Sequence, residues 1–412
     1  MAAAPSPSTS RKLPELTGRI GRFWLFMSPV SADVSGGYTS NWMLRELEGQ
    51  VVEAEIGATP TLRYKRGRFM VSTPLSASWR ETFGFSLRQV KLDGGLKISG
   101  RVLQDFQLGA EGGFARTWRP GWPDLYQPLL DQAGARTGLA STDRYSYDSW
   151  DVAAGLTWFH PLGRTTVEGG FSRHLYDVDP GYDPVLSPTH LVPLDRDIAR
   201  ASISTQLKFE RTLGIRVKGT VQSIADPLAY ARDAGTGTTH SGIGGLPSNP
   251  RQDFFRWSTD ARLSAWLRPL KTRLGLSVGF EHNDDLFQDY YTWSAPSAGA
   301  DVRVRPVRSL ALEASYEVLL RTYTASGYQE GPGHPPLDRG DAVRELSRHR
   351  VAAEAAYSMS SRRLQPYVEF AWQQVDTNFP DYEPYLFPEG SAYDIDFDYS
   401  WLTVMAGVRL RL

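Results

Sequence analysis

The chain has 412 residues, with 45 basic and 46 acidic side chains and a formal net charge of -1. This balance excludes the broad positive surface of a nucleic-acid-binding protein, and the absence of cysteine excludes disulfides and thiolate metal sites. No stretch approaches the roughly 20 consecutive apolar residues that a membrane-spanning helix needs. A polar average is nevertheless compatible with a membrane β-barrel, whose strands alternate lipid-facing and water-facing residues.

The N-terminal residues MAAAPSPSTS contain neither the basic nor the apolar region of a secretory signal peptide. The chain is therefore expected to be a mature form whose signal peptide has been removed. Residues 1–16 are expected to be a flexible segment, and residues 17–412 are expected to form a single domain.

Alternation of apolar and polar residues is clearest in the second half of the chain. Between Ala201 and Phe209 every second residue is apolar or small, and the residues between them are polar or charged. The same period of two recurs in 215–222, 256–268, 273–281 and 310–321. A period of two marks a β-strand with one apolar and one polar face, so an all-β fold is predicted.

The connections between these strands alternate between tight and long. Tight turns are expected at 57–60, 160–163, 211–214, 269–271, 306–309 and 360–363, and long polar loops at 119–147, 177–196, 225–253 and 323–349. Short periplasmic turns and long extracellular loops are typical of outer-membrane barrels. A soluble β-sandwich also alternates, but its dry core would not normally hold rows of charged residues.

The sequence therefore predicts a closed antiparallel transmembrane β-barrel in the outer membrane, in contact with its lipid. The strands number about 16, starting near 31–41 and closing with 393–412, or about 18 if residues 17–27 also enter the barrel. A change of parity in the last strand predicts a β-bulge near Ser400–Leu402.

The polar strand face is expected to line an aqueous lumen, because charges at this density need water or partners. Both signs of charge are present, which argues against a strongly ion-selective pore. The candidate lumen-lining residues are Arg200, Arg216, Lys218, Arg256, Asp260, Arg262, Arg273, Glu281, Asp301, Arg303, Glu313, Glu317, Arg321, Arg350, Glu354, Glu369 and Arg409.

Aromatic residues on the apolar face are predicted to form girdles at the two membrane interfaces, where amphipathic rings are favoured. The alternative is that they are ordinary strand aromatics without a preferred level. The candidates beside tight turns are Trp158, Phe209 and Tyr357, and those nearer the long loops are Trp257, Tyr316, Trp372 and Tyr399.

Motifs for catalysis or metal binding are not evident. The histidines are scattered without the paired spacing of a zinc site, and no Gly-x-Ser-x-Gly motif is present. Three carboxylates in 177–183 suggest a calcium loop, but the spacing is not that of an EF-hand and Asp-Pro-Gly is typical of a turn. The chain is predicted to be non-enzymatic, without a metal or a cofactor.

One segment is more specific than the general barrel pattern. The strand Ser35-Gly36-Gly37-Tyr38-Thr39-Ser40-Asn41, the apolar segment 51–56, Pro60-Thr61-Leu62-Arg63-Tyr64 and the basic turn at 67–69 resemble the opening of the β-barrel porin 2 family. Residues 42–45 (WMLR) replace the family's small apolar residue and acidic loop, and Leu412 replaces the commonest terminal Phe of outer-membrane barrels.

This resemblance implies a function without implying catalytic residues. Members of the family often resemble the outer-membrane partners of polysaccharide secretion systems. The resemblance therefore implies export of an exopolysaccharide together with a periplasmic polysaccharide-export protein and an inner-membrane machine. Two alternatives remain open, namely a general diffusion porin for small polar solutes and a structural anchor for a motility or adhesion complex.

Overall fold

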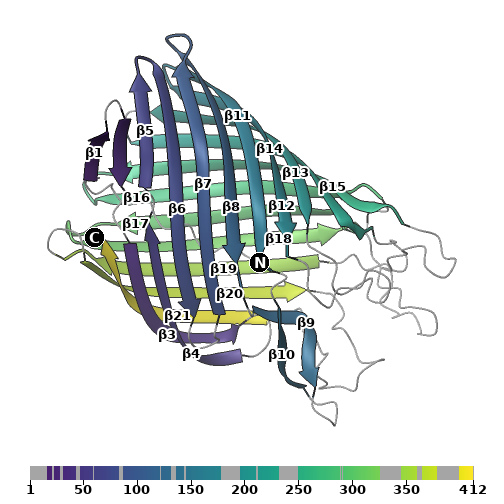
Figure 1. Cartoon of the computed structure of the whole chain (residues 1–412). Helices are drawn as coiled ribbons and strands as arrows, with labels where there is room; N and C mark the ends of the chain where they lie inside the picture. Colours follow the sequence, from purple (N-terminus) through teal and green to yellow (C-terminus); the bar gives the residue numbers. More distant parts are fainter. Residues whose placement is uncertain are drawn as a thin grey trace.

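The computed structural model describes most of the chain (Figure 1). The described residues are 16–20, 23–27, 31–42, 47–58, 60–82, 87–120, 122–130, 136–142, 145–177, 195–209, 212–231, 249–287, 289, 291–324, 345–359, 364–377 and 399–411. In this described part, no helix is long and apolar enough to cross a membrane.

A closed antiparallel ring of 16 strands forms the body of the molecule. The ring closes because the last strand pairs with the first, from Arg411↔Ser31 to Thr403↔Thr39. The predicted fold class and the strand number of about 16 are therefore confirmed. In ring order the strands are β3 (Ser31–Trp42), β4 (Leu47–Ala58), β6 (Phe69–Thr82), β7 (Leu87–Arg101), β8 (Phe106–Trp118), β11 (Tyr147–His160), β12 (Gly163–Tyr176), β13 (Arg196–Phe209), β14 (Leu213–Tyr230), β15 (Arg251–Leu267), β16 (Thr272–Asp285), β17 (Trp293–Val304), β18 (Leu310–Tyr323), β19 (Glu345–Tyr357), β20 (Leu364–Thr377) and β21 (Tyr399–Arg411).

Three further strands extend the sheet beyond the ring. β1 (Leu16–Ile20) pairs with β2 (Phe23–Met27), which pairs with β5 (Pro60–Arg66). These strands lie at the end of the barrel where β21 finishes (Figure 1). Residues 17–27 thus form strands outside the closed ring, and the alternative of 18 ring strands is wrong.

The turn expected at 57–60 is also wrong. β6 pairs with β4 through Ala58↔Ala77 and with β5 through Thr61↔Pro74. Both pairings follow the same antiparallel register along β6. β4 and β5 therefore lie end to end along β6, and the chain does not reverse direction between them. Pro60 fits this place because proline is tolerated at the first position of a strand.

The connections at the two ends of the ring differ in length. At the rim where β21 ends, successive strands are joined by short segments such as 161–162 and 268–271. At the other rim, five longer segments join them, namely 119–146, 177–195, 231–250, 324–344 and 378–398, whereas 43–46, 83–86 and 286–292 are short. β14 continues to Tyr230, β15 begins at Arg251 and β19 begins at Glu345, so two of the predicted loops are shorter than expected.

Two local expectations also differ from the structure. The segment expected to be a loop at 119–147 contains a two-stranded hairpin, formed by β9 (Trp122–Leu130) and β10 (Arg136–Thr142). The backbone pairing of β21 with β20 runs from Val375↔Tyr399 to Leu364↔Leu410 without a register shift, so the expected bulge near 400–402 is absent. Residues 393–398, which the sequence assigned to this strand, lie outside the described residues.

The turn between β5 and β6 depends on a glycine. Gly67 has a φ of 58°, in the left-handed region that side chains with a Cβ adopt at a cost. Gly67→Ala is expected to destabilise the folded barrel by about 1 kcal/mol, measured as a shift in its urea unfolding midpoint in lipid vesicles. Gly219→Ala is the matched control, because a Cβ there meets only the Ile203 side chain at an ordinary 3.7 Å. Equal losses in both variants would contradict the prediction.

Candidate functional site: the wall of the lumen

The two faces of each ring strand differ in polarity. On β16, Leu276 and Val278 are 59% and 61% exposed, and the same alternation on the neighbouring strands carries other exposed aliphatic and aromatic side chains. The intervening positions, including Arg273 and Glu281, point to the opposite face. An apolar surface that covers the outside of a closed barrel is stable only in a lipid environment. The chain is therefore a membrane barrel of the outer-membrane type.

The strand registers place every predicted lumen residue on the face opposite this apolar surface. Ion pairs between strands bring many of them together. Arg303 pairs with Glu313 at 2.9 Å, and Arg256 pairs with Glu281 at 3.5 Å. The other pairs that involve predicted residues are Arg262–Asp301, Arg200–Glu168, Arg348–Glu317 and the contacts of Arg409.

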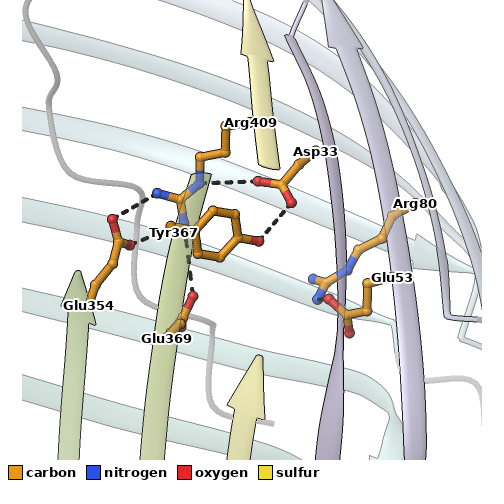
Figure 2. Close-up of polar contacts among 7 residues, drawn as sticks. All are labelled: Asp33, Glu53, Arg80, Glu354, Tyr367, Glu369 and Arg409. Carbon is orange, nitrogen blue, oxygen red and sulfur yellow. Dashed lines mark hydrogen bonds and ion pairs between the residues drawn. The ribbon is translucent and has the colours of Figure 1, made fainter. Parts of the chain in front are cut away.

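The densest network lies at the seam where the ring closes (Figure 2). The Arg409 guanidinium contacts Asp33 at 3.1 Å, Glu354 at 2.8 and 3.1 Å, and Glu369 at 3.9 Å. Its central carbon also lies 3.9 Å from the centre of the Tyr367 ring, and the Tyr367 hydroxyl donates a 2.7 Å hydrogen bond to Asp33. One guanidinium on β21 thus joins side chains of β19, β20 and β3. Asp33 was not among the predicted site residues.

Negative charge predominates on the wall around this seam. We call Asp33, Glu53, Glu55, Glu354 and Glu369, on β3, β4, β19 and β20, the acidic wall. Two arginines pair with this set: Arg409, as above, and Arg80, whose Nη2 lies 2.6 Å from Glu53 (Figure 2). Among the described residues, two guanidinium groups therefore pair with this set of five carboxylates, and Arg350 adds a further cation on the same face of β19.

Positive charge predominates on the opposite wall. We call Lys208, Arg216, Lys218, Arg262 and Arg273, on β13 to β16, the basic wall. Asp260 and Glu281 lie on the same face of β15 and β16 and are fewer than these cations. β14 lies eight strands from β3 in the ring of 16, which is half of the way around. The predicted lumen thus has an excess of acidic residues near the seam and an excess of basic residues on β13 to β16, which the strand order reveals.

One part of the inner face near the long connections, on β17 and β18, is packed. Trp293 is 6% exposed and clusters with Ala295 and Leu319. Arg321 and Arg256 stack on the Trp293 ring, at 4.0 and 5.5 Å from its centre. Sequence reasoning missed this cluster, although the alternation of β17 places Trp293 on the same face as Asp301.

The predicted girdle aromatics lie on the outer face wherever their side chains are described. Trp158, Trp257, Tyr316 and Tyr357 are exposed there, and Phe209 and Trp372 share the outward alternation. Tyr316 lies in the middle of β18, 2.8 Å from the His349 ring, so it is not near the long loops. The unshifted register of β21 puts backbone position 399 in the alternation of position 409, and the side chain of Tyr399 is outside the described ones. Girdles at two membrane levels remain a prediction.

Metal ligands do not gather in the part of the chain that the structure describes, where no group of three or more suitable side chains occurs. Asp177, from the suggested calcium loop, pairs with Arg116 through two hydrogen bonds of 2.8 and 2.6 Å. Asp179 and Asp183 lie outside the described residues.

The segment that resembles the β-barrel porin 2 family occupies the start of the ring. It runs through β3, β4 and β5 to the turn at Gly67. No protein-family model matches the sequence, however, and no curated protein matches it either. The specific family therefore remains a prediction.

Several solved structures of outer-membrane barrels are similar to this chain in overall fold. OmpT of Vibrio cholerae, in a trimer form, is 10% identical with a TM-score of 0.48, and the match covers 95% of this chain and 100% of that one. OccD3 of Pseudomonas aeruginosa is 11% identical with a TM-score of 0.42, covering 94% and 91%. A bacterial polysaccharide outer membrane secretin is 10% identical with a TM-score of 0.42, covering 93% and 99%. Likenesses at this level assign neither a solute nor a partner.

Proposed function

We propose that this barrel is an outer-membrane conduit for polar solutes, and specifically for an exopolysaccharide that a periplasmic export protein delivers to it. The observation that carries the proposal is the closed ring of 16 strands with a charged inner face. A ring of this size is too wide for its own side chains to fill. Exposed inner charges such as Arg216 and Glu317 need water around them.

Export of a sugar chain is favoured by the chemistry of the inner face and by the sequence resemblance at β3 to β5. Serine, threonine and glycine alternate with the charges along β13 to β16. Hydroxyl groups and charged groups can replace the water around the hydroxyls of a sugar. A non-enzymatic role accords with this wall, which presents many separate polar groups rather than one concave site.

A general diffusion porin is the second candidate. The observation that favours it is the separation of acidic and basic walls, because a field across the lumen favours small polar solutes over apolar ones. A structural anchor needs only a barrel that is held in the membrane, so it would not require a charged lumen.

Conductance and genetics test the proposal together. The purified chain in planar bilayers should give stable single-channel currents, and neutral and acidic oligosaccharides added on the side of the short turns should interrupt them.

Deletion of the gene should remove surface polysaccharide and leave small-solute uptake intact. Loss of small-solute uptake with normal surface polysaccharide would favour the porin. Loss of an envelope assembly without either change would favour the anchor.

A further inference from the structure

The basic wall contains cationic side chains that have no ion-pair partner in the described part of the chain. Arg216 and Arg262 lie directly opposite each other in the β14–β15 register. Like charges at directly opposed positions destabilise a sheet. Arg262 is neutralised by Asp301, and Asp260 lies directly opposite Lys218 in the same register, but Lys208, Arg216, Lys218 and Arg273 form no ion pair with any described residue. Lys208, Arg216 and Arg273 are also exposed to the lumen.

The acidic wall behaves differently. Arg409 and Arg80 hold Asp33, Glu354 and Glu53 in short contacts, so much of its charge already has a partner. The basic wall therefore has free binding capacity for an anion, and the acidic wall has little capacity for a cation. A chain that carries negative charges would also be repelled from the acidic wall toward the basic one.

The positions beside the basic side chains leave room for a ligand. Arg216 is opposite Gln206 on β13, and Lys218 is opposite Ser204. On the other side, Arg262 is opposite Ser277. Ser204 and Ser277 are small hydroxyl side chains next to long cationic ones, so they leave space between the charges and supply donors and acceptors for sugar hydroxyls. Gln206 already accepts a hydrogen bond from Arg164 at 3.1 Å. This combination suits a sugar that bears a carboxylate.

We propose that the basic wall binds the carboxylate groups of an acidic sugar chain, with Arg216 and Lys218 as its principal contacts. This inference rests on the proposed conduit and specifies its solute class. Arginine can hold a carboxylate through two parallel hydrogen bonds. Lys218, on the same face of the strand as Arg216, adds a point charge. Several weak contacts spread over β13 to β16 hold a chain without trapping it.

Two double variants test the assignment. Arg216→Gln with Lys218→Gln removes two unpaired cations from the basic wall. Lys91→Gln with Lys97→Gln is the matched control, because it removes two lumen-facing cations from β7 that pair with Asp93 and Glu111 at 3.8 and 2.6 Å. Both variants change the net charge equally. The probes are an oligogalacturonate, a neutral maltodextrin of equal length and free galacturonate.

Binding is measured by fluorescence anisotropy with the full chain folded in detergent, and by block of single-channel current. The oligogalacturonate should bind the native barrel at least about ten-fold more tightly than the maltodextrin, as two charge-assisted contacts imply. Arg216→Gln with Lys218→Gln should remove about ten-fold of that affinity, and the control should change it by less than about two-fold. Free galacturonate should bind weakly, because it makes only one contact.

Three outcomes would overturn the inference: equal binding of the acidic and neutral chains, equal effects of the two double variants, or equal binding of free galacturonate. Detergent binding needs no current, so a barrel that binds the acidic chain but never conducts would defeat the proposed conduit alone. A barrel whose current responds to both chains alike would retain the conduit and lose the acidic solute.

Discussion

Arg409→Ala is expected to destabilise the folded barrel by about 2 kcal/mol. The substitution leaves Asp33, Glu354 and Glu369 near one another without the guanidinium that they share. Removing one partner of a fully buried ion pair costs roughly 3–5 kcal/mol, and removing one from an exposed pair costs less than about 1 kcal/mol. The Arg409 side chain is 26% exposed, so its loss should fall between these limits.

Equilibrium unfolding in urea, followed by gel mobility of unheated samples from lipid vesicles, measures this loss. Arg216→Ala is the control, since Arg216 lies on the same inner face without an ion pair and should change stability by less than about 0.5 kcal/mol. The loss of stability in Arg409→Lys should fall between the losses in the two alanine variants, because lysine keeps the charge but loses the paired hydrogen bonds. If both alanine variants lost the same stability, the seam network would not hold the ring closed.

The alternation of the strands could be predicted from sequence because it is local. Backbone geometry sends successive side chains to opposite faces, so Arg216, Glu313 and Glu354 could be placed on one face without knowing any partner strand. The expected turn at 57–60 was wrong for a local reason as well. The segment Gly57-Ala58-Thr59-Pro60 has the composition of a turn, and only the shared register along β6 shows that the chain continues there.

The separated walls and the seam network could not be predicted, because both depend on how the ring closes. Asp33 and Arg409 are 376 positions apart in sequence, and they meet only because β21 pairs with β3. The sequence predicted both signs of charge on the lumen face. Which charges face each other across the lumen follows from the strand order, to which hydrophobic periodicity is blind.

Val278→Arg is expected to cost about 2–4 kcal/mol of folding free energy, the range for an arginine at the middle of the lipid-facing side of a barrel. Val278 lies at the centre of β16 and is 61% exposed on the apolar face. Ser277→Arg is the matched control, because the neighbouring position faces the lumen, where an added charge remains in water. It should cost less than about 1 kcal/mol, including the repulsion from Arg262 directly opposite. Urea titration of folding into vesicles measures both. A larger loss at 277 than at 278 would mean that the faces are assigned the wrong way round, and with them the lumen, its two walls and the conduit.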